Sequence, residues 1–271
     1  MFLNRKELNT MLSPSKIKNK LATRYIGQTI CYFPQLSSTN NIAKQKAQKG
    51  KSRTPEGTLI IAEKQLGGKG RSGKVWLSPV GGIWLSIVLY PKTVSTHVPL
   101  ITIMTAVAVA RTLNKLFPIK VQIKWPNDIL IEKRKVCGIL TETGTEEKNL
   151  KWVIVGIGIN ADNNSTELPE EIRNRSISLK EITGQPIPRI KLIQYLCSEF
   201  EMFYDLWQKK AFSAIIEEWK LYSYTLGEKV RVDIGNRIIS GEAIDITDRG
   251  ALVLKRDDGQ IEEIISGTVL K

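Results

Sequence analysis

Histidine and cysteine, on which many metal sites and catalytic triads depend, are scarce in this chain. Its 271 residues include one histidine, His97, and three cysteines, Cys31, Cys137 and Cys197. The cysteines are far apart and show neither a zinc-ligand spacing nor the pattern of a disulfide framework, which indicates a reducing compartment. Sites that depend on histidine are nearly excluded, and we expect His97 to be a surface or helix-capping residue.

Long apolar runs are also missing. The most apolar segment, residues 98–110, is too short for a bilayer span and carries Thr102 and Thr105, so it predicts a buried helix instead. The first residues lack an apolar core followed by a small-residue cleavage site, which argues against a signal peptide. Together with the cysteine usage, these absences predict a cytoplasmic globular protein with no membrane partner.

Acidic residues are too few to balance the basic ones, and the formal net charge is +13. Much of the excess lies within residues 1–50, where nine cations face a single acid, Glu7. A basic nucleic-acid-binding protein is therefore one hypothesis, but it requires a groove-entering helix or a stacking platform, and the sequence shows neither. A solvated basic face is the more ordinary interpretation.

Hydrophobic periodicity divides the chain into strand-like and helical segments. Strands are predicted at 58–65, 83–90, 121–124, 129–132, 136–143 and 151–158. Helices are predicted at 42–48, 99–117, 190–207 and 212–222. Residues 162–176 are polar and rich in turn formers, which is typical of a mobile loop.

The pattern changes after Gly227. Short alternating segments, separated by hairpin-turn signals, follow at 229–234, 237–246, 251–256 and 260–265. They predict a small β-barrel. We therefore expect a basic N-terminal extension at 1–25 that holds at most one short helix, a main domain at 26–224 and a small domain at 225–271.

The most informative segment is the glycine loop, residues 67–76. Its four glycines surround Lys69, Arg71 and Lys74, so backbone N–H groups and cations can converge on a phosphate. The loop also fits the GxGxxG dinucleotide fingerprint, which needs a helix directly after it and an acid about 20 residues further on. A strand-like run follows instead, and Thr93 occupies the position of the acid. The pattern therefore predicts a phosphate-binding loop between two strands.

Three further segments place polar residues at strand ends. The first, residues 124–128 (KWPND), predicts a turn that presents a lysine and an aspartate at a strand edge. The second, residues 134–142, opens an apolar strand with cations, so that Lys135 can meet a ligand with little screening. The third, residues 155–160, is a buried strand whose alternating glycines leave room for something flat. Taken singly, each has an ordinary explanation as a turn, a solvated lysine or tight strand packing.

In this order, the segments resemble the motifs of the biotin protein ligase family. The family pattern is a Ser-Thr-Asn segment, a GRGRxGRxW loop, KWPND, RKxxGIL and GxGxN, followed by a small SH3-like domain. The corresponding residues here are 38–40, 68–76, 124–128, 134–140 and 156–160. The resemblance covers roughly residues 25–271. It implies an α/β (α+β) fold with a mixed, largely antiparallel sheet and helices of the class II synthetase type, plus a C-terminal SH3-like β-barrel.

The chain departs from the family pattern at two positions of the glycine loop. Lys69 and Lys74 stand where the family usually has arginine. Lysine keeps the charge but lacks the bidentate fork of arginine. Lys69 would contribute its backbone to the biotin site, whereas Lys74 would face phosphate, so the departure bears mainly on ATP affinity.

The resemblance implies an ATP-dependent, AMP-forming biotin–[biotin carboxyl-carrier protein] ligase. Biotin would be activated with Mg²⁺-ATP to biotinyl-5′-AMP and then transferred to a specific lysine of a biotin carboxyl carrier domain. A carboxylate that attacks a polyanion is repelled by it, so cations must neutralise both reactants and hold them in line. The protein would be a monomer or a homodimer.

The motif positions supply the candidate site residues. Arg71 and Lys135 are the expected catalytic cations, on the carboxylate and the α-phosphate. Asp128 would orient Lys135, accept a proton from the incoming lysine or help to hold Mg²⁺. The candidate biotin-binding residues are Ser38, Thr39, Asn40, Gln65, Gly68, Lys69, Gly70, Arg71, Lys135 and Gly138. The candidate ATP-binding residues are Arg71, Lys74, Trp76, Lys124, Lys135 and Asn160.

The residues leave an alternative open. A lipoate or octanoate attachment enzyme shares this type of catalytic fold, although the glycine loop, KWPND and the C-terminal barrel favour biotin. Many relatives carry an N-terminal helix-turn-helix and repress transcription, but too few residues precede the catalytic part here for a three-helix unit. We therefore expect no specific DNA partner, and the basic N-terminal residues would serve solvation or attract an acidic carrier domain.

Overall fold

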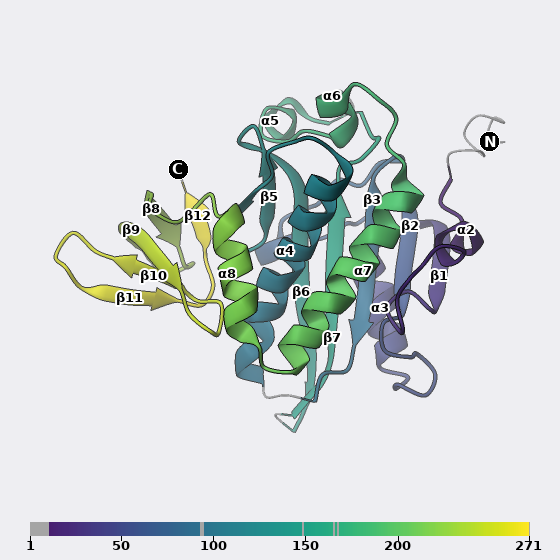
Figure 1. Cartoon of the computed structure of the whole chain (residues 1–271), viewed down its shortest axis with the longest axis horizontal. Coiled ribbons are helices and arrows are strands. Elements are labelled where there is room, and N and C mark those ends of the chain that lie inside the picture. Colours follow the sequence, from purple (N-terminus) through teal and green to yellow (C-terminus); the bar gives the residue numbers. More distant parts are fainter. Residues whose placement is uncertain (1–10, 93–94, 148, 165, 167, 271) are drawn as a thin grey trace.

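The computed structural model describes residues 11–92, 95–147, 149–164, 166 and 168–270, and a seven-stranded sheet forms its centre (Figure 1). The strands are β1 (Ile30–Leu36), β2 (Leu59–Gln65), β3 (Ile83–Leu89), β4 (Gln122–Lys124), β5 (Asp128–Ile131), β6 (Arg134–Glu146) and β7 (Asn149–Ile159). Their order is β1-β2-β3-β7-β6-β5-β4. β1 and β2 are parallel, and the other neighbours are antiparallel. The predicted mixed, largely antiparallel sheet is confirmed.

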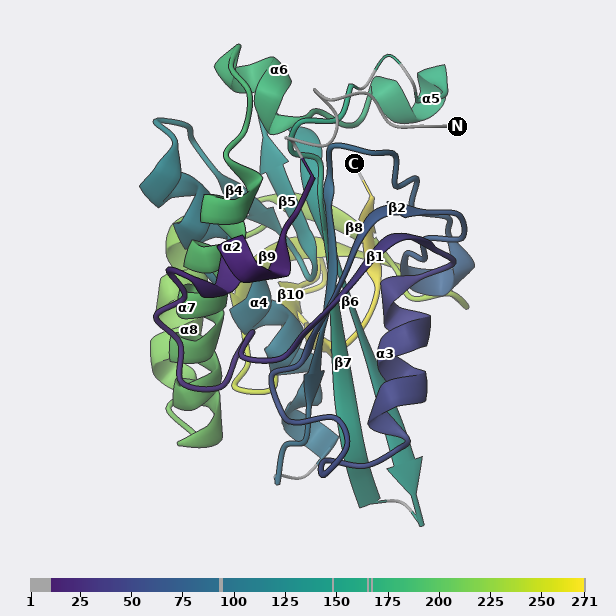
Figure 2. The same cartoon turned by 90° about the vertical axis from the view of Figure 1, so that its right-hand side faces the viewer.

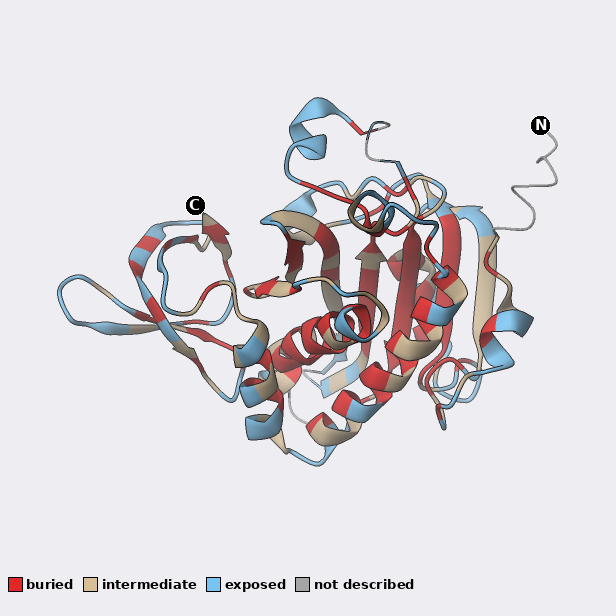
Figure 3. Cartoon of the chain, turned by 45° about the horizontal axis from the view of Figure 1, so that its top comes forward, coloured by how far each residue is buried: buried red, intermediate tan, exposed pale blue. Residues whose placement is uncertain are grey.

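Helices cover both faces of this sheet. The helices of the described chain are α2 (Pro14–Lys18), α3 (Thr39–Ala47), α4 (Val98–Leu116), α5 (Glu170–Arg173), α6 (Leu179–Thr183), α7 (Arg189–Gln208) and α8 (Phe212–Tyr222), with 3₁₀ turns η1 (Arg71–Gly73) and η2 (Ser95–His97); α5 and α6 lie at one end of the sheet. Figure 2 shows α4, α7 and α8 on one side of the sheet and α3 on the other. Buried residues are concentrated on the central strands and on the helix faces turned towards them (Figure 3).

The apolar run from residue 98 forms the buried helix that its composition predicted. It lies within α4, where residues from Leu100 to Ala110 are almost all buried. His97 is the N-cap residue of α4, and its ring stacks on Phe212 with the ring centroids 4.5 Å apart. Among the described residues, no helix combines the length and the apolarity needed to cross a membrane.

Residues 11–26 pack against α7, although their composition is basic. Leu12 and Ile17 are buried in the main core. The Gln194 side chain donates hydrogen bonds to two carbonyl groups of α2, and the Glu201 carboxylate accepts three successive backbone N–H groups that precede β1. This part of the predicted extension therefore contributes to the fold as well as to the charge. Residues 1–10 of that extension lie outside the described residues.

The C-terminal residues form a second sheet, which is antiparallel throughout. Its strands are β8 (Lys229–Asp233), β9 (Ile238–Ile246), β10 (Leu252–Lys255), β11 (Ile261–Ile264) and β12 (Thr268–Leu270), in the order β11-β10-β9-β8-β12. Four of them match predicted segments, and β12 was not predicted. Trp125 joins the two parts of the molecule, because its indole N–H donates to the Gly250 carbonyl oxygen at 3.1 Å and its backbone N–H to the Thr225 hydroxyl.

β1 is the largest element that the periodicity did not predict. Its sequence, ICYFPQL, contains Pro34, which cannot donate a hydrogen bond to a neighbouring strand. β1 lies at the edge of the sheet and pairs only with β2, so the proline is tolerated there. Residues 162–176, predicted as a loop, contain α5, and α6 follows with a capping box between Ser178 and Glu181.

Candidate active site

The five motifs meet at a cavity of about 420 Å³ lined by the large sheet, the glycine loop and the C-terminal sheet. The sequence-predicted residues that line it are Ser38, Thr39, Asn40, Gln65, Lys69, Gly70, Arg71, Lys74, Trp76, Lys124, Asp128, Lys135, Gly138 and Asn160. Gly68 alone among the predicted residues does not line it. A Cβ at Gly68 would lie 2.3 Å from the Trp76 carbonyl oxygen, so the loop requires glycine there for its own backbone packing.

The glycine loop joins β2 to β3 as a hairpin. The N–H of Trp76 donates to the Gly68 carbonyl oxygen at 2.9 Å, and the N–H of Gly70 donates to the Lys74 carbonyl oxygen at 2.7 Å. η1 forms its tip, and β3 rather than a helix follows. The hairpin has none of the strand–loop–helix geometry of a dinucleotide fold, in agreement with the sequence.

The indole of Trp76 lies over two glycines of the sheet. A Cβ at Gly158 would lie 2.5 Å from Trp76 Nε1, and one at Gly138 would lie 3.0 Å from Trp76 Cζ3. These glycines face each other across β6 and β7. Lys135 Nζ is 5.0 Å from the centre of the indole, within the range of a cation–π contact. Of the two alternating glycines in residues 155–160, Gly158 therefore makes room for the flat Trp76 side chain of the glycine loop, whereas Gly156 faces Asn40.

Arg71 reaches from the glycine loop to the KWPND turn and to the C-terminal sheet. Its Nη1 donates to Asn127 Oδ1 at 3.0 Å, and its Nη2 donates to Ser266 Oγ at 3.1 Å. Burial lowers the pKa of Arg71, and the negative charge of Asp128 opposes this effect. Because both hydrogen-bond acceptors are neutral, the guanidinium charge has no ion-pair partner among the described residues and is available to an anion.

Lys135 and Asp128 form an ion pair, with 2.6 Å between Nζ and Oδ1. The KWPND turn pairs Lys124 with Asp128 on adjacent strands, which brings a second lysine to the same carboxylate. Burial lowers the pKa of Lys124, and the charge of Asp128 again opposes the effect. One carboxylate thus faces two lysines, and the positive charge around it remains in excess.

The predicted biotin-binding side chains hydrogen-bond to one another on a different part of the wall. Gln65 Oε1 accepts the backbone N–H of Thr39 at 2.8 Å and its hydroxyl at 3.1 Å. The Ser86 hydroxyl donates to Asn40 Oδ1 at 2.5 Å, and the Asn40 amide donates to the Glu142 carboxylate at 2.7 Å. The Glu142 carboxylate is paired with Lys44, so the network carries no net charge. This neutral network holds the wall in a fixed shape, and the Asn40 amide is already engaged within the protein.

Sequence comparison agrees with this geometry. Residues 32–160 match the model of the Biotin/lipoate A/B protein ligase family, and residues 225–271 match that of the Biotin protein ligase C terminal domain. The bifunctional ligase/repressor BirA of Bacillus subtilis (strain 168) is 37% identical over 259 residues, which are 95% of this chain and 78% of that relative. This chain belongs to the biotin protein ligase family.

Further relatives in the biotin protein ligase family extend the comparison. The biotin–[acetyl-CoA-carboxylase] ligase of Mycobacterium tuberculosis is 29% identical over 229 residues, covering 81% of this chain and 80% of that protein. The solved structure of the biotin protein ligase from Aquifex aeolicus in complex with biotin and ATP has a TM-score of 0.78 at 28% identity, over 90% of this chain and 98% of that one. The names of these relatives favour biotin over the lipoate alternative, and the predicted family, fold and enzyme class are confirmed.

Other cavity residues of this biotin protein ligase family member were missed by the sequence. Leu168, Ile172, Arg175 and Ser176 come from the segment predicted as a mobile loop, and residues 267–269 come from the C-terminal sheet. The position of the loop directly after β7, which ends at the GIGIN motif (residues 156–160), was a usable signal, because residues that follow a binding strand often reach the site. Residues 267–269 gave no such signal, since only the packing of the two sheets brings them to the cavity.

Proposed function

We propose that this chain condenses biotin with Mg²⁺-ATP to biotinyl-5′-AMP and then transfers biotin to a lysine of a biotin carboxyl carrier domain. The family membership supports the reaction class. The structure of the Aquifex aeolicus relative was solved with biotin and ATP, and the chain shares its fold over nearly the whole length.

The observation that carries the proposal is the uncompensated charge of Arg71 beside the Lys135–Asp128 pair. In the first half-reaction, a biotin carboxylate oxygen attacks the α-phosphorus of ATP, and the bond from this phosphorus to the bridging oxygen breaks to release pyrophosphate. Both reactants are anions, so the barrier contains a large electrostatic repulsion. Arg71 would hold the carboxylate and Lys135 the α-phosphate, with Lys124 and Lys74 on the outer phosphates.

In the second half-reaction, the amine of the carrier lysine attacks the acyl carbon of biotinyl-AMP, and AMP leaves. The amine also loses a proton. Two carboxylates line the cavity, and we assign Asp128, the one paired with Lys135, as the proton acceptor. Mg²⁺ would enter with ATP as part of the substrate. Among the described residues, no group of three or more potential metal ligands gathers, so the ATP phosphates would be its main ligands, with Asp128 beside them.

We place the reaction in a reducing compartment such as the cytoplasm. All three cysteines are free thiols. Burial raises the pKa of the Cys197 thiol to about 12, and Cys137 is also buried with a raised pKa. These two thiols stay protonated near neutral pH and serve as packing residues.

The test is to incubate the purified chain with ATP, Mg²⁺ and biotin, to follow pyrophosphate release and to identify the adenylate by mass spectrometry. Parallel samples receive lipoate or octanoate. We expect biotinyl-AMP alone. Formation of lipoyl-AMP instead would show that the chain is a lipoate attachment enzyme. The absence of an adenylate with all of the acids would contradict the proposal.

A further inference from the structure

The backbone of Arg175 is tied to the candidate catalytic lysine. The N–H of Lys135 donates to the Arg175 carbonyl oxygen at 2.8 Å, and the N–H of Ile177 donates to the Lys135 carbonyl oxygen at 3.0 Å. Residues 175–177 therefore run beside the first residues of β6 as a short parallel pairing. This pairing fixes where the Arg175 side chain starts, directly next to Lys135.

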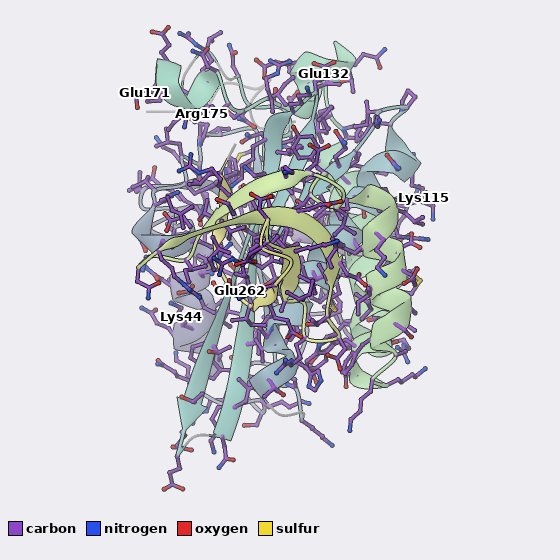
Figure 4. The ribbon with its side chains drawn as sticks, turned by 90° about the vertical axis from the view of Figure 1, so that its left-hand side faces the viewer. Lys44, Lys115, Glu132, Glu171, Arg175 and Glu262 are labelled. Carbon is purple, nitrogen blue, oxygen red and sulfur yellow. The ribbon has the colours of Figure 1, made fainter. Side chains whose placement is uncertain are left out.

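The Arg175 side chain lines the cavity and carries a free charge. The residue is exposed, and Figure 4 shows it together with Glu171 near α5. Within the part of the chain that the structure describes, its guanidinium makes no hydrogen bond, ion pair or ring contact, not even with Glu171. A guanidinium without a partner at a cavity wall offers several N–H donors to an incoming anion.

β6 indicates which end of the substrates Arg175 faces. The Asn40 amide, in the neutral network, donates to the Leu140 carbonyl oxygen at 3.3 Å, whereas Arg175 lies beside Lys135. The five residue steps from Lys135 to Leu140 span about 16 Å of strand at roughly 3.3 Å per step. Arg175 is therefore at the far end of the cavity from the predicted biotin wall, where the nucleotide would lie.

The chemistry of this end suits a polyphosphate. The cavity as a whole has six cations against two carboxylates, Asp128 and Glu171. Of the cations, only Lys69 reaches Asn41 beside the neutral network, and Asp128 is already paired with Lys135. Lysine replaces the usual arginine at two positions of the glycine loop, so fewer bidentate donors come from that side. Arg175 supplies a bidentate donor from the segment after β7. Its exposure suits the binding of pyrophosphate, which must leave the cavity after the first half-reaction.

We propose that Arg175 binds the β- and γ-phosphates of ATP, which leave as pyrophosphate. This inference rests on the proposed function. Arg175 adds this contact from the segment that follows β7. It serves the first half-reaction only, because biotinyl-AMP no longer contains these phosphates. Its loss is expected to affect ATP and pyrophosphate and to leave biotin and the transfer to the carrier lysine unaffected.

The test compares Arg175→Ala, Arg175→Lys and the control Arg173→Ala in the full chain. Arg173 is an exposed arginine two residues away in α5, and it does not line the cavity. In Arg175→Ala we expect the KM for ATP to rise about 10-fold or more and the affinity for Mg²⁺-pyrophosphate, measured by calorimetry, to fall by a similar factor. The lysine variant should recover part of the loss, and the control should match the wild type.

Two readouts separate a phosphate contact from a structural role. The KM for biotin and the rate of transfer from preformed biotinyl-AMP should be unchanged in Arg175→Ala. Equal losses in all steps, or an unchanged pyrophosphate affinity, would overturn the inference. A wild-type chain that forms no biotinyl-AMP would defeat the proposed function instead, and the pyrophosphate calorimetry on the same samples would still decide whether Arg175 binds this anion.

Discussion

The two ends of the cavity hold their side chains in different ways. We call the neutral end the side chains of Thr39, Asn40 and Gln65, and the charged end those of Arg71, Lys124 and Lys135. At the neutral end, the side chains hydrogen-bond to each other and to the sheet. At the charged end, the Arg71 guanidinium donates hydrogen bonds only to neutral acceptors. The single carboxylate of Asp128 faces both Lys124 and Lys135.

We expect this difference to separate recognition from catalysis. A satisfied network has a fixed shape and can select an uncharged ring, but it gains little when charge moves during the reaction. Cations that lack full compensation gain most when an anionic transition state forms between them. Substitutions at the neutral end should therefore act mainly on biotin affinity, and those at the charged end mainly on the rate of adenylation.

The largest expected effect comes from removing a cation at the charged end. Arg71→Ala or Lys135→Ala should slow the formation of biotinyl-AMP by roughly 10²–10³-fold, as for the loss of one preorganised charge donor. Single-turnover pyrophosphate release measures this rate. Lys120→Ala, an exposed lysine outside the cavity, is the control and should behave as the wild type. Near-normal turnover in both cavity variants would refute the assigned roles.

A smaller effect is expected when a substitution in the strand under the neutral end displaces the Asn40 side chain. A Cβ at Gly156 would lie 2.3 Å from Asn40 Oδ1, so Gly156→Ala must displace the amide from the Ser86 hydroxyl. We expect the KM for biotin to rise about 10-fold and the free energy of unfolding to fall by about 1–3 kcal/mol.

The control for this variant is Gly67→Ala, whose Cβ would have only the Ser37 carbonyl oxygen nearby, at 3.6 Å. Steady-state kinetics with each substrate varied in turn, together with thermal melting, give the comparison. An equal rise in the KM for ATP would show that the two ends are not separate.

The charged end was more predictable from sequence than the neutral end. Arg71, Lys124 and Lys135 lie in short motifs whose glycines, proline and strand ends carry local signals. Ser86 and Glu142 lie within ordinary strands, and their contacts with Asn40 arise only when α3 packs on the sheet. No local pattern encodes such a contact.

The same limit applies to the fold. Strands with clear alternation were found, whereas β1 was missed because its proline is acceptable only at a sheet edge, which is a tertiary property. Arg175 and Ser266 look like ordinary surface residues in the sequence. Arg175 reaches the cavity because its segment pairs with β6, and Ser266 contacts Arg71 because the C-terminal sheet packs beside the glycine loop.

The link between the C-terminal sheet and the charged end should have a modest effect. Ser266→Ala removes one of the two acceptors of Arg71 and leaves the Asn127 contact. Because Ser266 is exposed, we expect adenylation to slow only about 3-fold. Ser240→Ala, an exposed serine of β9, is the matched control, and the same rate assay applies. Equal rates in the two variants would show that Ser266 does not position Arg71.

The smallest effect concerns the protonation of Lys124. Burial lowers its pKa, so in the folded chain this ammonium loses its proton at a lower pH than a solvated lysine does. Phosphate binding requires the charged form; it is therefore strongest below the lowered pKa and weakens as the pH rises through it. The KM for ATP should rise between neutrality and about pH 10.

In Lys124→Arg the rise should be flatter, because arginine stays protonated. Lys120→Arg is the control and should follow the wild type. Identical pH profiles for the wild type and Lys124→Arg would remove Lys124 from the charged end and leave the outer phosphates to Lys74 and Arg175.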